Sequence, residues 1–119
     1  MSACQSDETI SGYANPDTVW QLQDLNGLAF PATATITFPE EGKIAGRAPC
    51  NSYSAAQSAP YPWFETGAIT TTKIACPALK AETQYLHALA AMTLIEVSGD
   101  TLILPNDDGT QMVFAAAAN

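Results

Sequence analysis

The chain of 119 residues has the length of one domain of ordinary size, so a two-domain architecture is excluded within it. Hydrophobic residues make up 47% of the sequence and charged residues 13%, which indicates a globular domain with one core rather than a disordered chain. Four Lys and Arg against twelve Asp and Glu give a net charge of −8, and a surface of that sign repels nucleic acid and anionic lipid. No apolar run approaches the roughly 18 to 20 residues of a membrane span.

The first residues carry the pattern of an exported bacterial N-terminus. Ser2-Ala3-Cys4 matches the last three positions of a lipobox, in which the cysteine receives the lipid. The polar residues that follow contain Gly and Pro without an apolar period, which predicts a tether over residues 1–17 and a folded domain over residues 18–116. We therefore expect lipidation at Cys4. The alternative is an accidental cysteine on a disordered tail.

Alternating apolar and β-branched residues predict that most of the domain is antiparallel sheet. Ala34, Ile36 and Phe38 alternate with threonines, as expected for a strand with one face in the core. Turn residues such as Asn26-Gly27 separate the predicted strands, which we expect to number about six or seven and to be joined mostly as a meander. The segments with this strand pattern lie near 20–22, 34–38, 43–48, 68–74, 94–97, 101–104 and 110–114, with 50–57 as a further extended segment.

Residues 77–92 break the period of two and predict the single helix of the domain. Pro77 is expected at the first helical position, where its missing N–H costs nothing. Glu82 lies at the centre of the arc that should face the sheet, so we expect a buried carboxylate that needs hydrogen bonds, a cation or a proton. At about 100° per residue, the other members of that arc are Leu79, Tyr85, Leu86, Leu89, Ala90, Met92 and Thr93.

Several short motifs, taken together, are specific to one family. They are Trp20-x-Leu22 with Gly27, Gly46 followed by Cys50-Asn51-Ser52-Tyr53, Gly67-Ala68-Ile69 with Thr72-Lys73-Ile74-Ala75-Cys76, Glu82 with Tyr85, Leu86 and Leu89, and Gly99-Asp100-Thr101-Leu102-Ile103-Leu104. With these motifs the sequence closely resembles the META domain family, which includes heat-shock-inducible bacterial lipoproteins linked to novobiocin resistance. Two positions depart from the family pattern, since Pro49 and Ala55 stand where glycine is common.

The resemblance implies an α+β domain in which a strongly curved antiparallel sheet, a partly open barrel, wraps around one helix near 77–92. It also implies that Cys50 and Cys76 lie on adjacent strands, so in an oxidising periplasm we expect a disulfide between them. Two buried free thiols are the alternative. Because Gln5 rather than Asp follows Cys4, we expect lipid anchoring on the periplasmic side of the outer membrane.

The sequence offers little for catalysis, and we expect a protein that is not an enzyme and uses no cofactor or metal. His87, the only histidine, lies opposite the apolar arc and is expected to be a solvated surface residue. The CxxC and HExxH motifs of metal sites are absent, and Asp107-Asp108 lacks the further oxygens of a calcium loop. A general-acid role for Glu82 has no partner base or nucleophile, so hydrogen bonds to backbone or hydroxyl groups are expected instead.

Three aromatic residues within Tyr61-Pro62-Trp63-Phe64 form the candidate contact site. Pro60 and Pro62 exclude a helix here, and Phe64 matches a position that the family buries. Tyr61 and Trp63 match no core position. We expect them either to contact a partner or ligand or to cover an open end of the sheet.

Two functions are expected from these observations. The first is a non-enzymatic cell-envelope lipoprotein that acts as a binding or stress-protection module, with no nucleic-acid partner and with membrane contact only through the anchor at Cys4. The second follows from the resemblance of some META proteins to pilotins, whose cracked barrel holds an acyl chain or the tail of a partner protein. The partner is then an envelope protein or an apolar ligand, and we expect the chain to be a monomer.

Overall fold

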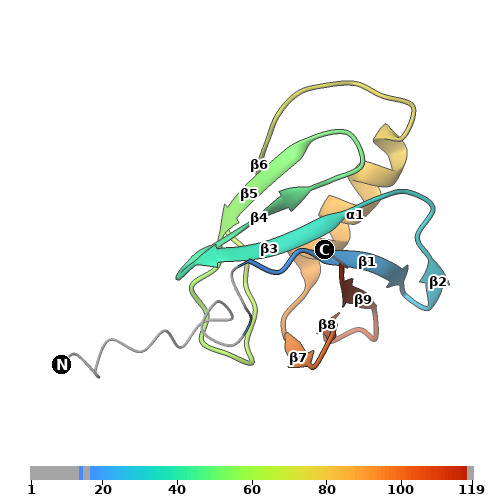
Figure 1. Cartoon of the computed structure of the whole chain (residues 1–119). Helices are drawn as coiled ribbons and strands as arrows, with labels where there is room; N and C mark the ends of the chain where they lie inside the picture. Colours follow the sequence, from blue (N-terminus) through green and yellow to red (C-terminus); the bar gives the residue numbers. More distant parts are fainter. Residues whose placement is uncertain (1–13, 15–16, 118–119) are drawn as a thin grey trace.

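The computed structural model describes residue 14 and residues 17–117. The predicted lipidation site Cys4 and nearly all of the predicted tether lie outside these residues. Figure 1 shows the elements that follow one another along the described chain. They are β1 (Trp20–Leu25), β2 (Leu28–Ala29), β3 (Thr35–Glu40), β4 (Lys43–Arg47), β5 (Ser52–Ala56), β6 (Thr70–Thr71), α1 (Leu79–Ala91), β7 (Glu96–Ser98), β8 (Thr101–Pro105) and β9 (Gln111–Ala116).

All the strands belong to one antiparallel sheet, which is strongly curved and not closed. Its order is β6-β5-β4-β3-β1-β9-β8-β7, and β2 pairs with β1 at the side. Two meanders, β3 to β6 and β7 to β9, are joined by β1, which pairs with β3 on one edge and β9 on the other. Figure 1 shows α1 running along one side of this sheet. The predicted α+β class, with a curved sheet around one helix, is therefore confirmed.

A short irregular pairing joins the two ends of the sheet, where β6 and β7 are not neighbours. Residues 62–64 run antiparallel to residues 93–95 through a bridge between Trp63 and Leu94. Two backbone hydrogen bonds of 2.8 and 2.9 Å flank this bridge. The aromatic segment predicted as a contact site therefore lies where the barrel would otherwise stay open.

The core follows the predicted alternation. Ala34, Ile36 and Phe38 are fully buried, as is Tyr85 from the helix. The ring of Tyr85 packs edge-on against Phe114, with ring centroids 6.5 Å apart. One aromatic ring from α1 thus anchors the helix to the centre of the sheet.

The turn at Asn26-Gly27 is tighter than a simple break between strands. Both residues have positive φ, 56° and 84°, which suits the Asn-Gly pair and the twist of a two-residue hairpin. The hairpin adds β2, which the sequence pattern does not predict, because its two exposed residues carry no alternation. With β6 it is one of two strands of only two residues, so the described residues form nine strands, seven of them longer than two residues, where about six or seven were expected.

Two boundaries differ from the sequence-based expectations. The helix begins at Leu79 with Ala78 as its N-cap, so Pro77 lies in the preceding turn and not at the first helical position. The disulfide at Cys76 and the bond from Leu79 N to the Cys76 carbonyl (3.1 Å) fix this turn before the helix begins. The strand predicted over 68–74 shrinks to β6. The Thr72 N–H still bonds to the Ser52 carbonyl of β5, but the Ile74 N–H bonds to the side chain of Asn51 instead of a strand.

The buried face of α1 is narrower than the predicted arc. Glu82, Tyr85, Leu89 and the C-cap Met92 are buried, whereas Leu79 is 44% exposed and Ala90 is also exposed. Leu79 lies in the first turn, beside the exposed loop that enters the helix. Within the described residues, no helix is long and apolar enough to cross a membrane.

Candidate functional site

Glu82 receives its hydrogen bonds from a neighbouring loop rather than from the sheet. Its Oε1 accepts the backbone N–H groups of Cys50 (2.8 Å) and Asn51 (2.7 Å), and its Oε2 accepts the Asn51 side-chain amide at 2.7 Å. Glu82 lies in the first turn of α1, where a negative charge also suits the helix dipole. Burial of Glu82 and its bonding to backbone groups are as predicted.

Asn51 is the other half of this arrangement and is itself buried. Its Oδ1 accepts the Thr72 hydroxyl (2.8 Å) and the Ile74 N–H (2.7 Å), while its Nδ2 donates to the Ile74 carbonyl (3.0 Å) as well as to Glu82. The Asn51 side chain thus bonds to both the N–H and the carbonyl group of Ile74, as the backbone of a neighbouring strand would. Asn51 joins the helix, the β4–β5 connection and the loop after β6 at one point.

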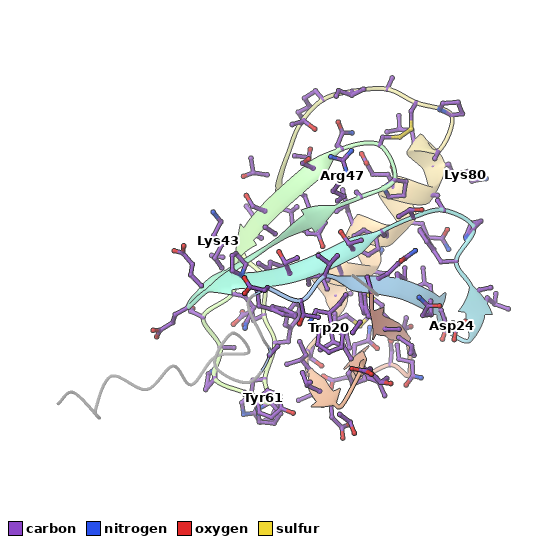
Figure 2. All side chains as sticks on the ribbon, viewed as in Figure 1. Trp20, Asp24, Lys43, Arg47, Tyr61 and Lys80 are labelled. Atoms are coloured by element: carbon purple, nitrogen blue, oxygen red, sulfur yellow. A yellow bond between two sulfur atoms is a disulfide. The ribbon has the colours of Figure 1, made fainter. Side chains whose placement is uncertain are left out.

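A disulfide between Cys50 and Cys76 closes the same assembly, as predicted. The expected placement on adjacent strands is wrong, since Cys50 lies in the β4–β5 connection and Cys76 in the loop before α1, where the strand predicted over 68–74 has already ended. The two Cα atoms are 5.8 Å apart, and the bridge spans 26 residues of sequence. Figure 2 shows it at the end of the molecule where the loop after β6 enters α1. The disulfide and the Asn51–Glu82 bonds therefore fix the same loop from two sides.

The polar side chains of this cluster are used in hydrogen bonds within the protein. Each oxygen of the Glu82 carboxylate and each polar atom of the Asn51 side chain is occupied by a hydrogen bond. Its contacts are backbone groups, an amide and a hydroxyl, none of which acts as a base toward a substrate. The arrangement holds the structure together, with two hydrogen bonds to Oε1 and one to Oε2 of the carboxylate. Elsewhere among residues 14 and 17–117, no three His, Cys, Asp or Glu side chains gather where they could hold a metal ion.

A second buried polar pair connects the helix to the sheet. The hydroxyl oxygens of Tyr53 and Tyr85 are 2.6 Å apart, and they lie 2.7 and 3.2 Å from the Thr35 carbonyl oxygen. Glycine is required beside them, since a Cβ at Gly46 would overlap that carbonyl and come 3.0 Å from the Tyr53 hydroxyl. Burial raises the pKa of both phenols well above the ordinary value, and for Tyr53 the neighbouring Tyr85 raises it further.

These raised pKa values predict an alkaline limit to stability. Tyrosine in the unfolded chain loses its proton near pH 10, while Tyr53 and Tyr85 keep theirs in the folded protein. Above about pH 10 the folded state therefore binds more protons than the unfolded state. The free energy of unfolding falls as the pH rises through this range. Absorbance at 295 nm should show two tyrosines that titrate only on unfolding, and one in Tyr85→Phe. Titration of both near pH 10 in the folded protein would contradict the assignment.

The main hollows of the surface meet at the C-terminal end of α1. One groove of about 790 Å³ runs between the outer face of the helix, including His87, and the turns β1–β2 and β8–β9. A second of about 580 Å³ lies between the helix end and the segment that contains Trp63. Both are lined by Ala91 and Met92, so they adjoin at the end of the helix. His87 is exposed, as predicted.

The aromatic residues beside the second groove differ in how deeply they are buried. Phe64 is 2% exposed, as the resemblance implied, whereas Trp63 is 58% exposed. Tyr61 is half-buried against the core, and its hydroxyl accepts the Val97 N–H at 3.2 Å. A contact role stays a prediction for Tyr61 and Trp63, and Trp63 offers the larger free surface.

Replacing Trp63 with alanine should leave the fold nearly intact. Because most of the side chain is already in solvent, we expect the free energy of unfolding to change by less than about 1 kcal/mol. Phe64→Leu removes less volume from a buried ring and should cost more, about 1.5 kcal/mol. Urea unfolding of the two variants makes the comparison. A loss of about 3 kcal/mol or more in Trp63→Ala would mark that side chain as core.

The geometry defines a disulfide-closed α+β domain whose curved sheet packs on one helix. The sequence model of the META domain matches residues 14–119, and the chain belongs to this family. A comparison with curated proteins finds no significant match.

Solved structures share this fold at low sequence identity. An NMR structure of a protein from Burkholderia xenovorans is 23% identical, with a TM-score of 0.68 over 87% of this chain and 83% of that chain. The crystal structure of a DUF4847 family protein from Bacteroides vulgatus is 15% identical, with a TM-score of 0.68 over 89% and 96% of the two chains. At these identities the likeness concerns the fold alone.

Some residues of these clusters have no role in the sequence-based predictions. Asn51 and Tyr53 belong to the motifs that carry the resemblance, but their partners lie 31 and 32 residues away in Glu82 and Tyr85. Gln57, also buried, accepts the backbone N–H groups of Ala59 and Glu65 and shapes the loop before the aromatic segment. The burial of Gln57 could have been predicted from its position, since it is a polar residue on the side of the predicted strand that faces the core.

Proposed function

We propose that the chain is a non-enzymatic cell-envelope lipoprotein, anchored through Cys4 on the periplasmic side of the outer membrane, that acts as a binding or stress-protection module. The observation that carries the proposal is the Cys50–Cys76 disulfide, because such bonds persist in exported proteins and are rare in the cytosol. The lipobox remnant before residue 5 supports the anchor. Membership of the META family supports an envelope role.

The absence of an enzymatic role is supported by how the buried polar groups are used. Glu82, Asn51, Tyr53 and Tyr85 are the buried groups that could serve chemistry, and each bonds to its neighbours inside the fold. A catalytic carboxylate or phenol instead faces a cleft where a substrate can reach it. Neither groove beside α1 is lined by any of these four residues, and only Tyr53 borders a smaller hollow, of about 250 Å³, over β5 and β6.

Cell fractionation of the full precursor tests the anchor. We expect the unchanged protein to stay with membranes after a high-salt wash and to be released by detergent, because acyl chains are held by burial and not by charge. Cys4→Ala should instead appear in the soluble periplasmic fraction, whereas the control Ser6→Ala should not. Salt-resistant membrane association of Cys4→Ala would count against lipid anchoring.

A second candidate function is supported by the grooves around the end of α1. Their linings are mainly apolar, with Met92 shared and Trp63 exposed at one edge, which suits an acyl chain or an apolar peptide tail. The chain has two tryptophans, and Trp20 is buried. Added decanoate should therefore shift the fluorescence of Trp63 to the blue, and Trp63→Phe should remove the shift. An unchanged emission spectrum at saturating decanoate would oppose this function.

A further inference from the structure

The positive charges of this acidic chain are not spread over its surface. Of the four Lys and Arg residues, Arg47 ends β4, Lys73 follows β6, and Lys80 lies in the first turn of α1. Figure 2 shows Arg47 and Lys80 toward one end of the molecule, and Lys43 toward the other end of β4. Three of the four cations are thus associated with the end that carries the disulfide.

Backbone and side-chain contacts hold these positions together. Arg47 donates to the Ser52 hydroxyl at 3.4 Å, and Ser52 exchanges bonds of 3.2 Å with Thr72, the residue before Lys73. The disulfide joins Cys50, in the connection between β4 and β5, to Cys76, at the end of the loop that carries Lys73 and leads to Lys80 in α1. The cations therefore lie on one stapled structure and not on separate mobile segments.

The chain segments that carry Arg47, Lys73 and Lys80 hold few acidic residues, although Lys80 lines the same groove as Asp108 of the β8–β9 turn. The sequence has no Asp or Glu from Gly42 to Phe64 or from Thr66 to Ala81, and Glu82 is buried with its oxygens hydrogen-bonded. Glu40 ends β3 opposite Lys43, and Glu41 follows it in the turn; the four residues of β4 from Lys43 to Arg47 span about 13 Å at 3.3 Å per residue. That distance exceeds the Debye length of about 8 Å at physiological salt, so their charges are largely screened from an anion at Arg47.

Two large aliphatic side chains are exposed at the same end. Ile74 is 61% exposed and Leu79 is 44% exposed, although the loop between them is fixed by the disulfide and by Asn51. A rigid loop that presents apolar side chains next to ammonium groups is suited to an interface that is anionic outside and apolar beneath. We call this surface the basic tip, and it consists of Arg47, Lys73, Ile74, Leu79 and Lys80.

We propose that the basic tip binds the anionic phospholipid headgroups of a membrane surface, with Ile74 and Leu79 reaching below the headgroups. A nucleic acid is a poorer fit because the tip has no aromatic side chain on which a base could stack. The net charge of −8 predicts repulsion from anionic lipid. Because salt screens distant charges, the local positive charge of the tip determines the interaction when the tip faces the membrane.

The strength of the contact fits a protein that is already tethered. Each basic side chain near an anionic surface contributes about fivefold in affinity, so three give a factor on the order of 100. Such weak binding becomes effective when an anchor supplies a high local concentration, and to this extent the proposal rests on the anchored state proposed above. In that state the tip would set which end of the domain faces the bilayer.

Vesicle binding of the chain of 119 residues, with its disulfide formed, tests the proposal. Sedimentation with phosphatidylglycerol–phosphatidylcholine vesicles, up to on the order of 10 mM lipid, should show binding that vesicles of phosphatidylcholine alone do not. Lys73→Gln should weaken it about fivefold, and Lys73→Gln with Lys80→Gln about 25-fold. Lys43→Gln removes the same charge from the opposite end of β4 and should change binding less than about twofold.

The apolar part of the tip has its own matched control. Ile74→Ser should weaken binding several-fold, whereas Leu28→Ser, at a side chain 74% exposed in β2, should not. Unchanged circular dichroism and thermal midpoints are expected for all these variants because their side chains are exposed. Absence of binding, equal loss in Lys43→Gln and Lys73→Gln, or equal retention by single-stranded DNA would overturn the proposal. These assays use no lipid anchor, so they fail or succeed independently of the Cys4→Ala fractionation.

Discussion

Glu82→Ala should lower the free energy of unfolding by about 3–5 kcal/mol. The substitution leaves the backbone N–H groups of Cys50 and Asn51 and the Asn51 amide without their acceptor inside the protein. Each such donor in a dry site costs about 1–3 kcal/mol, and hydrogen bonds to a charged acceptor are the stronger kind. Urea unfolding followed by circular dichroism measures the loss.

Two further variants sharpen that result. Glu65→Ala removes an exposed carboxylate and should change stability by less than about 0.5 kcal/mol. Glu82→Gln keeps the shape but presents an N–H₂ group where the Asn51 amide now donates, so an intermediate loss is expected. A Glu82→Ala variant as stable as Glu65→Ala would show that the carboxylate is not a structural centre.

Loss of the disulfide should be the second large effect. The double variant Cys50→Ser, Cys76→Ser opens a loop of 26 residues, for which the chain-entropy estimate is about 3 to 4 kcal/mol. Cys4→Ser exchanges the same side chain without touching the bridge and serves as the control. Equal unfolding midpoints for the double variant and the control in urea would refute a stabilising role for the bridge.

The disulfide and the carboxylate should also be coupled. Cys50 contributes both its sulfur to the bridge and its backbone N–H to Glu82. Residues that share a network lose stability non-additively when they are changed together. The double Cys→Ser variant combined with Glu82→Ala should therefore lose less than the sum of the separate losses. Strict additivity in unfolding free energy would mean that the two features act independently.

The parts of the fold that the sequence predicts are those with a local signal. The alternation at Ala34, Ile36 and Phe38 identifies β3 because each of these side chains must be buried on the same face. The Asn26-Gly27 pair identifies a turn because both residues take positive φ there. Such patterns depend on neighbours within a few residues, so one sequence is enough to find them.

What the sequence alone does not reveal depends on partners far along the chain. Glu82 stands out because a carboxylate on an apolar helix face is unusual, but its acceptor role requires a loop 31 and 32 residues earlier. The strand predicted through Ile74 ends early because the side chain of Asn51, from a different part of the chain, hydrogen-bonds to the backbone of Ile74. Neither competition has a periodic signature, because it arises only when the elements pack.

The placement of charges on the surface is also not predictable from the composition of the sequence. Composition gives the sum, −8, and from the sum alone anionic surfaces are excluded as partners. The fold places Arg47, Lys73 and Lys80 toward the disulfide end. Glu40 and Glu41 lie where β3 ends, and Asp107-Asp108 lie in the β8–β9 turn, where Asp108 lines the same groove as Lys80. Recognition depends on that separation at distances near the Debye length, which composition cannot express.

The mass of the intact protein purified from its native envelope tests most directly the claim that this is an exported, disulfide-closed lipoprotein. We predict a chain that begins at Cys4, carries glyceryl-linked acyl chains on that residue, and is two hydrogens lighter than the reduced form because Cys50 and Cys76 are joined. Alkylation after unfolding without a reductant should add nothing to either of these two cysteines. An unlipidated Cys4, or two alkylated thiols at Cys50 and Cys76, would contradict the account.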